Sequence, residues 1–295
     1  MLAHRTSYLH RMPVSIGRDN CFIRIASNVT RLSERNSWNG RVSRLSVAKS
    51  PGLFIIQVGI DYPTSRLGLR TMTSIDLLIQ SVRHSPQLPQ ILAVLQREWE
   101  NERQRRLRFY DEMTPEQKVE FIDGEVIMHS PARNRHLDAT GGLFRLLSTY
   151  VATRKLGQVK LEKCLCVFPR NDYEPDVVFF GLEKSQHFTA DTMKFPVPDL
   201  IVEVLSESTA ARDRGVKFED YAANGVREYW IVDAEEPSIE QYFLDGDKYR
   251  LNMKSGSGLL QSRVIDQLVF PIPAVFDEQA NLRQVAEFLE APTSN

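Results

Sequence analysis

The stretch PDLIVEVLSESTAARDRGVKFEDY, residues 198–221, has the pattern of a strand, a polar turn and a helix. Its first part contains an almost continuous apolar run, as in strands that are covered on both faces in α/β proteins. Glu203 lies inside this run. A buried carboxylate is costly unless a cation, a metal ion or a raised pKa compensates for it. The sequence must therefore supply a partner for Glu203.

The composition is that of a globular protein. The 295 residues are 42% hydrophobic and 25% charged, which suits one large domain or two smaller ones. The longest apolar run, LFIIQVGI, is far shorter than the roughly 18 residues that a membrane-spanning helix needs. We therefore do not expect an integral membrane protein.

The three cysteines are an odd number, so at least one is unpaired. They are Cys21, Cys164 and Cys166, and we interpret them as buried thiols of a cytoplasmic protein in a reducing compartment. The pair Cys164 and Cys166 would need a second pair of ligands to form a metal site, and none follows in the sequence.

Charge is distributed unevenly along the chain. Residues 1–71 contain ten Arg and one Lys against Asp19, Glu34 and Asp61, so 11 − 3 gives +8. Because the whole chain carries −1, the remainder carries −9. Affinity for phosphate backbones rests mainly on Lys and Arg. Any nucleic-acid site in this acidic remainder must therefore be a local basic patch.

Periodicity divides the chain into three parts. Residues 1–71 show no sustained helical or strand period, and we interpret them as an N-terminal extension. This extension is either a transit peptide or, as we favour, an over-extended gene model whose translation starts at Met72. Residues 72–118 are a helical lead-in, with helices predicted for 74–85 and 88–113.

Residues 119–290 form the main domain, for which we predict an α/β or α+β fold with helices around a mixed sheet. Asp123 and Gly124 separate two strand-like runs, as in a tight hairpin. The predicted helices cover 135–155 and 210–225. The further predicted strands cover 158–168, 176–180, 200–206, 228–233, 238–244 and 248–253.

Two acids lie on neighbouring predicted strands. Asp176 follows Pro175 at the start of one strand, and Glu203 lies 27 residues later in the next core strand. Such a pair can share Mg²⁺ or Mn²⁺, with the backbone carbonyl of Val204 as a third ligand. The alternative for Asp176 is a turn residue that only starts the strand.

Lys217 is the candidate cation. It follows Glu203 by fourteen residues, in the predicted helix, where an ammonium could face the attacking water and the charge that develops in phosphodiester cleavage. The alternative is a surface lysine paired with Asp213, one helical turn earlier. Glu120 and His136 are further candidates for the site. We favour structural roles for both, as a half-exposed strand residue and a helix-start residue.

Five segments carry a family resemblance. In order along the chain they are VEFIDGEVIMHSPARNRHL, YEPDVVFFG, PDLIVEVLSEST, DRGVKFEDYAANGVREYWIVD and SIEQYFLDGDKY. Together they resemble the Uma-type (Uma-two) "putative restriction endonuclease" family, over residues of about 110 to about 280. This family is similar to the PD-(D/E)XK nucleases. The resemblance implies a restriction endonuclease-like mixed four-stranded sheet flanked by helices, here with extra antiparallel strands.

The resemblance also implies roles for the charged residues. Asp176 corresponds to the PD aspartate and Glu203 to the D/E position. The superfamily pattern has a lysine two residues after that acid, where this chain has Leu205. The resemblance implies that the lysine has moved to the helix as Lys217.

Two functions follow. The first is a Mg²⁺-dependent endonuclease that cleaves DNA, with Asp176 and Glu203 as metal ligands and Lys217 positioning or polarising the attacking water. The second is a nuclease-fold protein that binds nucleic acid or a protein partner without cleavage, because a fold alone does not establish an activity. The direction of Lys217, toward the carboxylates or toward solvent, separates them. A homodimer would suit double-strand cutting.

Overall fold

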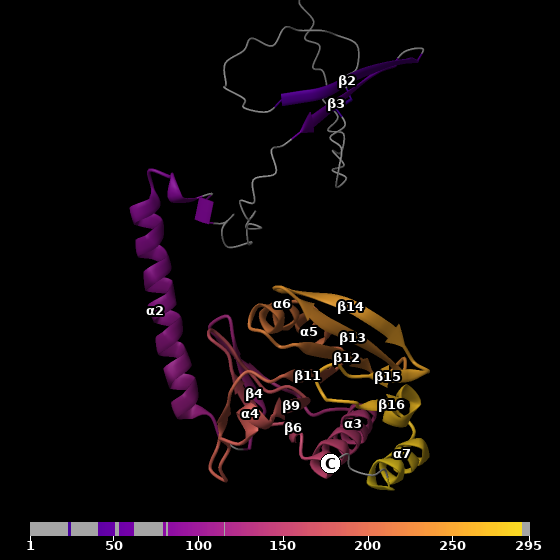
Figure 1. Ribbon diagram of the computed structural model, residues 1–295. Coiled ribbons are helices and arrows are strands. Elements are labelled where there is room, and N and C mark those ends of the chain that lie inside the picture. Colours follow the sequence, from indigo (N-terminus) through magenta and orange to yellow (C-terminus); the bar gives the residue numbers. More distant parts are fainter. Residues whose placement is uncertain are drawn as a thin grey trace, which may run out of the picture. The chain divides into compact units, whose positions relative to one another are not determined.

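The computed structural model describes residues 23–24, 41–50, 53–61, 79–80, 82–114 and 116–290, with side chains described from residue 79 on. It contains two units, Met1–His84 and Ser85–Asn295 (Figure 1).

The described strands of the first unit form one antiparallel sheet, in the order β1-β3-β2. They are β1 (Ile23–Arg24), β2 (Arg41–Ser50) and β3 (Leu53–Asp61). The weak periodicity of residues 1–71 did not predict these strands. Cys21, the expected translation start at Met72 and residues 74–78 of the first predicted helix lie outside the described residues.

The second unit begins with α2 (Leu88–Glu112), which confirms the second predicted helix. Pro89 lies in its first turn, where backbone N–H groups have no partner within the helix, so the N–H that proline lacks is not needed there. The strands β4 (Val119–Ile122) and β5 (Glu125–Met128) then form the predicted hairpin. Its turn residues Asp123 and Gly124 have φ of 51° and 83°, the left-handed conformation that such two-residue turns require.

The remaining elements run to the end of the described chain. They are α3 (Asn134–Arg154), β6 (Gly157–Leu161), β7 (Leu165–Val167), β8 (Asp172–Tyr173), β9 (Val177–Gly181), α4 (Leu182–Ser185), β10 (Lys194–Phe195), β11 (Leu200–Val204), α5 (Ala210–Asp213), α6 (Val216–Ala223), β12 (Glu228–Asp233), β13 (Ser238–Asp245), β14 (Lys248–Ser255), β15 (Leu259–Gln261), β16 (Val269–Pro271), the 3₁₀ helix η1 (Ile272–Val275) and α7 (Glu278–Glu290). Most of them confirm the predicted elements, and two predicted elements are divided.

The predicted strand 158–168 is two strands that belong to different sheets. β6 pairs with β9, whereas β7 pairs with β8 and β10. Lys163, between them, has φ of 56°, a left-handed conformation that ends a strand. Because no Gly or Pro marks this position, the apolar pattern alone did not reveal the break.

The predicted helix 210–225 is also divided, into α5 and α6. Gly215 lies at the break, with φ of −114° and ψ of −107°. A Cβ atom at this position would lie 2.8 Å from the carbonyl oxygen of Ala211, so the close approach favours glycine. As a result, Lys217 lies in the first turn of α6.

The core of the unit is a six-stranded sheet in the order β14-β13-β12-β11-β9-β6. β11 and β12 are parallel, and the other pairs are antiparallel. The fold is therefore the mixed sheet flanked by helices that the sequence predicted. A second sheet, in the order β10-β7-β8-β4-β5, carries the hairpin.

The two faces of the large sheet are covered differently (Figure 1). Along β11, Leu200, Val202 and Val204 pack into a core with α3 and α7. Ile201 packs into the opposite core, which contains residues of α6 and of the second sheet. Because side chains alternate along a strand, Glu203 lies on the same face as Ile201. The sequence thus directs the carboxylate toward α6.

Candidate active site

Asp176 and Glu203 lie on the same face of the large sheet. The register of β11 on β9 pairs Val202 with Val177, so the next residues along the ladder, Glu203 and Asp176, are neighbours. The backbone N–H of Val204 donates a hydrogen bond to Asp176 Oδ2 at 2.8 Å. Both carboxylates are buried. The strand pairing therefore brings the two predicted acids together.

Lys217 is the partner of Glu203. Its Nζ lies 2.9 Å from Glu203 Oε1 and 2.9 Å from Glu120 Oε1, and 3.5 Å from Asp213 Oδ1. The side chain is only 2% exposed, so Lys217 faces the carboxylates, and the surface-lysine alternative is wrong. Burial lowers the pKa of Lys217, but Glu120, Glu203 and Asp213 raise it to well above its ordinary value.

The hydroxyl of Tyr221 donates a second hydrogen bond to Glu203 Oε1, at 2.8 Å. Within the described chain both hydrogen bonds to Glu203 end on Oε1, so Oε2 is the oxygen left for a ligand. Burial raises the pKa of Glu203 to about 8, with Asp213, Asp176 and Glu120 adding to the rise and Lys217 opposing it. Lys217 thus faces three carboxyl groups, those of Glu203, Glu120 and Asp213; these residues, together with Asp176 and the side chains that contact it, are called the cluster below.

Glu120 and Asp213 complete the surroundings of Lys217. Glu120 is 0% exposed, so its interpretation as a half-exposed residue is wrong, because both faces of β4 are covered. Burial raises the pKa of Glu120, but Lys217 and His129 lower it more, to about 2. Burial raises the pKa of Asp213, and both of its carboxylate oxygens lack a hydrogen-bond partner among the described residues.

Asp176 lies between two further cationic groups. Lys118 Nζ donates a hydrogen bond to Asp176 Oδ1 at 2.7 Å, and His136 Nε2 lies 3.4 Å from the same oxygen. Burial raises the pKa of Asp176, but His136 and Lys118 lower it more, to well below its ordinary range. Burial lowers the pKa of His136, and Asp176 raises it above its ordinary value. Asp176 is therefore held as a carboxylate.

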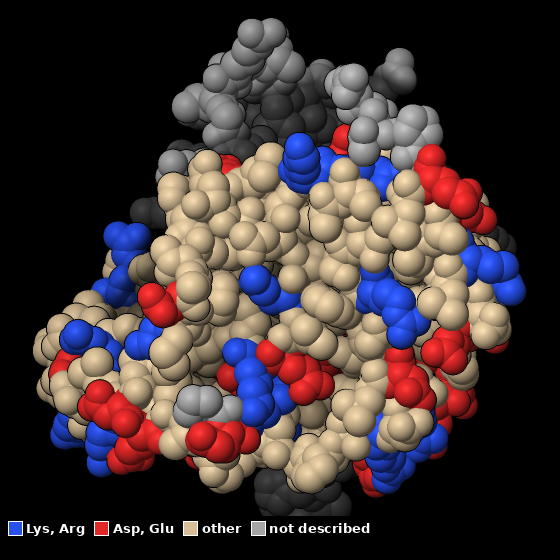
Figure 2. Space-filling model, turned by 90° about the horizontal axis from the view of Figure 1, so that it is seen from below, with Lys and Arg blue, Asp and Glu red and all other residues tan. Residues whose placement is uncertain are grey.

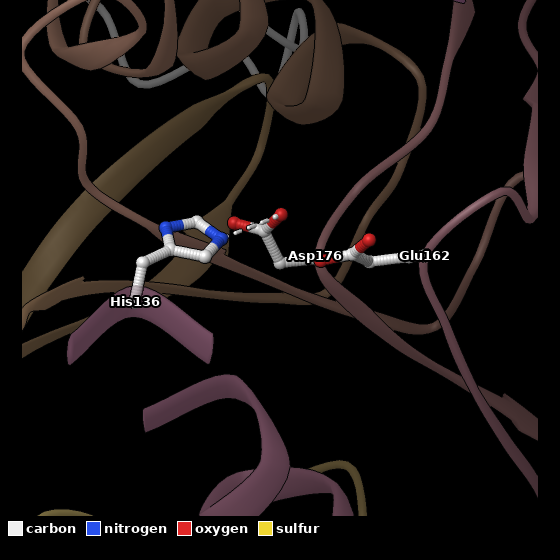
Figure 3. Close-up of side chains that lie close together, drawn as sticks. All are labelled: His136, Glu162 and Asp176. Carbon is white, nitrogen blue, oxygen red and sulfur yellow. Dashed lines mark ion pairs between the residues drawn. The ribbon is translucent and has the colours of Figure 1, made fainter. Parts of the chain in front are cut away.

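His136, Glu162 and Asp176 form a group that suits a divalent cation. One ligand atom of each lies within 4.8 Å of the others, and Figure 3 shows Asp176 between the imidazole and the second carboxylate. His136 comes from the first turn of α3, and the other two flank the β6–β9 ladder, where Glu162 N donates to Asp176 O at 3.3 Å. Carboxylate oxygens and imidazole nitrogen are suitable ligands for such cations.

Several residues of this cluster were not predicted, namely Lys118, His129, Glu162 and Glu174. His129 Nε2 lies 3.0 Å from Glu120 Oε2, and the backbone N–H of Glu174 donates to Glu120 Oε1 at 2.9 Å. Lys118 precedes Glu120 by two residues, so strand alternation could have placed both on one face. Glu162 depends on the register of β6 against β9, for which the sequence contains no signal.

A cavity of about 350 Å³ adjoins this cluster. Glu162 lines it together with apolar side chains, among them Leu165, Met193 and Phe195, and with Lys160. On the face that Figure 2 shows, the Lys and Arg side chains of the described residues alternate with Asp and Glu, and neither sign covers a continuous area.

Cys164 and Cys166 are confirmed as buried free thiols. Cys166 Sγ lies 3.3 Å from the carbonyl oxygen of Cys164, and burial raises the pKa of the Cys166 thiol. None of the helices in the described residues is both long and apolar enough to cross a membrane.

Comparison with known families gives a match over more than half of the chain. Residues 93–272 match the family described as "Uma2: Putative restriction endonuclease". The matched range contains all the acidic residues and lysines of the cluster.

Two proteins of the cyanobacterium Synechocystis sp. are similar in sequence. The uncharacterized protein sll1609 is 33% identical over 135 residues, which are 45% of this chain and 75% of that protein. The uncharacterized protein slr1290 is 29% identical over 185 residues, which are 60% of this chain and 89% of that protein.

Among solved structures with a similar fold is a crystal structure from Anabaena variabilis, described as a putative nuclease belonging to DUF820. The TM-score is 0.50 at 17% sequence identity, and the match covers 57% of this chain and 94% of the other. At this identity the likeness shows a shared fold.

Proposed function

This chain belongs to the Uma2 family of putative restriction endonucleases, and we propose that it is a divalent-metal-dependent endonuclease that hydrolyses phosphodiester bonds in DNA. The observation that carries the proposal is the buried cluster in which Asp176 and Glu203 lie on neighbouring strands and Lys217 contacts Glu203 at 2.9 Å. Such a cluster contributes little to stability that apolar residues could not supply. Perturbed carboxylates beside a cavity are typical of functional sites.

The residues present fit Mg²⁺ or Mn²⁺. Asp176 and Glu203 would be the principal ligands, with the carbonyl of Val204, and His136 and Glu162 flank Asp176. The excess of carboxylates and the raised pKa of Glu203 favour a bound cation. When bound, such a cation would lower the pKa of a coordinated water and stabilise charge on the phosphate.

The chain's own residues orient this centre. Lys217 Nζ and Tyr221 OH both donate to Glu203 Oε1, so they hold the Glu203 side chain in place and leave Oε2 for a ligand. Because Lys217 is closed in by carboxylates, we assign it a positioning role, in which it polarises the attacking water through Glu203. His136 Nε2, beside Asp176, can hold a proton near the reacting groups.

The test is cleavage of single- and double-stranded DNA by the purified protein, with Mg²⁺, with Mn²⁺ or with chelator. We expect cleavage only with a divalent cation, and loss of both cleavage and cation binding in Asp176→Asn. Asp199→Asn is the matched control, because Asp199 is also buried and paired with a lysine, Lys184, but lies outside the cluster. Cleavage in chelator, or full activity of Asp176→Asn, would contradict the proposal.

The second candidate function is binding of nucleic acid or a protein partner without cleavage. The observation that favours it is that protein donors already engage both oxygens of Asp176, from Lys118 and from Val204. The mixed charges in Figure 2 also offer no extended basic surface on that face. If the wild type binds DNA but cleaves no substrate under any cation, this second function holds. The homodimer stays a prediction.

A further inference from the structure

Lys118 and Lys217 are the two lysines of the cluster, and their surroundings differ. Lys217 is 2% exposed and lies within 3.5 Å of three carboxylates. Lys118 is 18% exposed and has one ion-pair partner among the described residues, Asp176, at 2.7 Å. An ammonium on a flexible four-carbon stem can change partners readily when it is not enclosed. Of the two, only Lys118 has the exposure and the freedom to exchange its partner.

The Lys118 ammonium lies where a cation is needed. It donates to Asp176 Oδ1, the oxygen that also lies 3.4 Å from His136 Nε2. Burial lowers the pKa of Lys118, but Asp176, Glu203 and Glu162 raise it above its ordinary value. The ammonium thus contacts one of the carboxylates that we assign to the divalent cation, Asp176, and is attracted by the others.

A divalent cation held by Asp176 Oδ1 and His136 would repel the ammonium that donates to the same oxygen. The other oxygen, Oδ2, accepts the backbone N–H of Val204 within the sheet, and that donor cannot move without disturbing β11. Lys118 precedes β4 and is held to Asp176 only by its side chain. It is therefore the group that can leave at small cost.

We propose that Lys118 is the exchangeable cation of this site. In the cation-free protein its ammonium neutralises Asp176; when a divalent cation binds, it releases Asp176 Oδ1 and turns to the substrate phosphate. This inference rests on the proposed function, because it takes the metal and the phosphodiester from it. It assigns the phosphate contact to Lys118 and leaves Lys217 to position Glu203.

The first measurement is Mn²⁺ binding by calorimetric titration of the full chain, without DNA. An internal competitor weakens the apparent affinity by the fraction of time that it occupies the site. We therefore expect Lys118→Met to bind Mn²⁺ about tenfold more tightly than the wild type. Lys184→Met is the matched control, because Lys184 Nζ makes a similar ion pair with Asp199 at 2.9 Å outside the cluster. Its Mn²⁺ affinity should equal that of the wild type.

The second measurement is thermal melting in chelator and in saturating Mn²⁺. Lys118→Met should melt below the wild type in chelator, because Asp176 loses one of its two cationic partners and keeps only His136, and should recover most of the difference with Mn²⁺. Lys184→Met should lose the same amount under both conditions. If Lys118→Met does not fold, Lys118→Gln, which keeps a neutral donor for Asp176, gives the same comparison.

The third measurement is DNA cleavage at saturating Mn²⁺, where Lys118→Met should lose activity although its cation binding is tighter. Three outcomes would overturn the inference alone: unchanged or weaker Mn²⁺ binding by Lys118→Met, an equal melting loss with and without Mn²⁺, or full cleavage by this variant. A wild type that binds no Mn²⁺ and cuts no DNA would overturn the proposed function, and the inference with it.

Discussion

At the scale of single residues, the site is an arrangement of charges that do not balance. Lys217 contacts three buried carboxylates, and Lys118 contacts a fourth. A buried charge without a partner is strongly destabilising, whereas a complete pair is close to neutral in its effect. The two kinds of substitution in this cluster, removal of a cation and removal of a carboxylate, should therefore have opposite effects on stability.

Removal of the Lys217 ammonium should lower the stability of the protein. Lys217→Met leaves Glu203 and Asp213 without their ammonium partner, while Glu120 keeps His129, so we expect a loss of about 3–5 kcal/mol in the free energy of unfolding. Urea denaturation measures it. Lys248→Met, at an exposed position of β14, is the control and should change stability by less than about 0.5 kcal/mol. A loss as small as that of the control would mean that Lys217 is not the counter-charge of the cluster.

Removal of one carboxylate should cost function and spare the fold. In Glu203→Gln a neutral amide replaces a carboxyl group whose pKa is raised by burial to about 8. Glu120 and Asp213 remain as partners of Lys217. We expect an unchanged or higher melting temperature in chelator, together with loss of Mn²⁺ binding and of DNA cleavage. Thermal melting, metal titration and a cleavage assay on the same preparation of this variant measure the three effects. Cleavage that survives in Glu203→Gln would exclude this residue from the mechanism.

At the scale of helices and strands, close backbone contacts hold the elements that carry the site. α3 carries His136 and packs on η1 at Gly142, where a Cβ atom would lie 2.6 Å from the carbonyl oxygen of Val275. Beside Gly141, one residue earlier in the same helix, nothing lies within 4 Å. The two glycines therefore differ in environment although they share a helix.

This difference predicts opposite effects of the same substitution. Gly142→Ala should destabilise the protein by about 1–3 kcal/mol, because α3 must move away from η1. Gly141→Ala should stabilise it by about 0.5–1 kcal/mol, because alanine favours the helix. Urea denaturation of both variants measures the difference. If both variants were stabilised, the contact between α3 and η1 would be looser than the structure has it.

The junction of α5 and α6 is fixed to β13 by charge. Arg214 donates two hydrogen bonds to Glu240, at 2.7 and 2.9 Å. The hydrogen bond from Arg214 lowers the pKa of Glu240 to about 2, although burial alone would raise it. A lowered pKa in the folded state contributes stability above the ordinary pKa near 4.5, and this contribution is lost as the pH falls toward 2.

Glu240→Gln should remove this contribution. We expect the variant to be less stable than the wild type at pH 7, and the difference to shrink as the pH falls from about 4.5 to 2. Urea denaturation at a series of pH values measures it. A difference that stays constant over this range would mean that the titration of Glu240 is not coupled to folding.

At the scale of the whole molecule, the sequence predicted the central sheet and the main acids because both leave local patterns. The apolar run around Glu203 indicated a buried carboxylate. The spacing left Lys217 as either the cation of the site or a surface lysine paired with Asp213, and the family resemblance implied the first. The breaks at Lys163 and Gly215 were not predicted, because a single residue of unusual backbone conformation hardly changes the apolar period. Glu162 was missed because its place depends on the pairing of distant strands.

The last prediction concerns residues 1–71, which carry the +8 charge. The described residues of the site, from Lys118 to Tyr221, belong to the unit Ser85–Asn295, and the buried core residues described for this unit run from Phe109 to Phe288. A chain that starts at Met72 should therefore fold and should bind Mn²⁺ with the same affinity as the full chain. Its melting temperature should lie within about 2–4 °C of that of the full chain, which for a unit of this size corresponds to roughly 1 kcal/mol. DNA affinity should fall on truncation only if the Arg-rich segment contacts phosphate, in which case the salt dependence of binding should fall with it. Thermal melting, metal titration and DNA binding at several salt concentrations, on both chains, separate these effects. A truncated chain that is insoluble or melts many degrees lower would show that the extension is part of the fold.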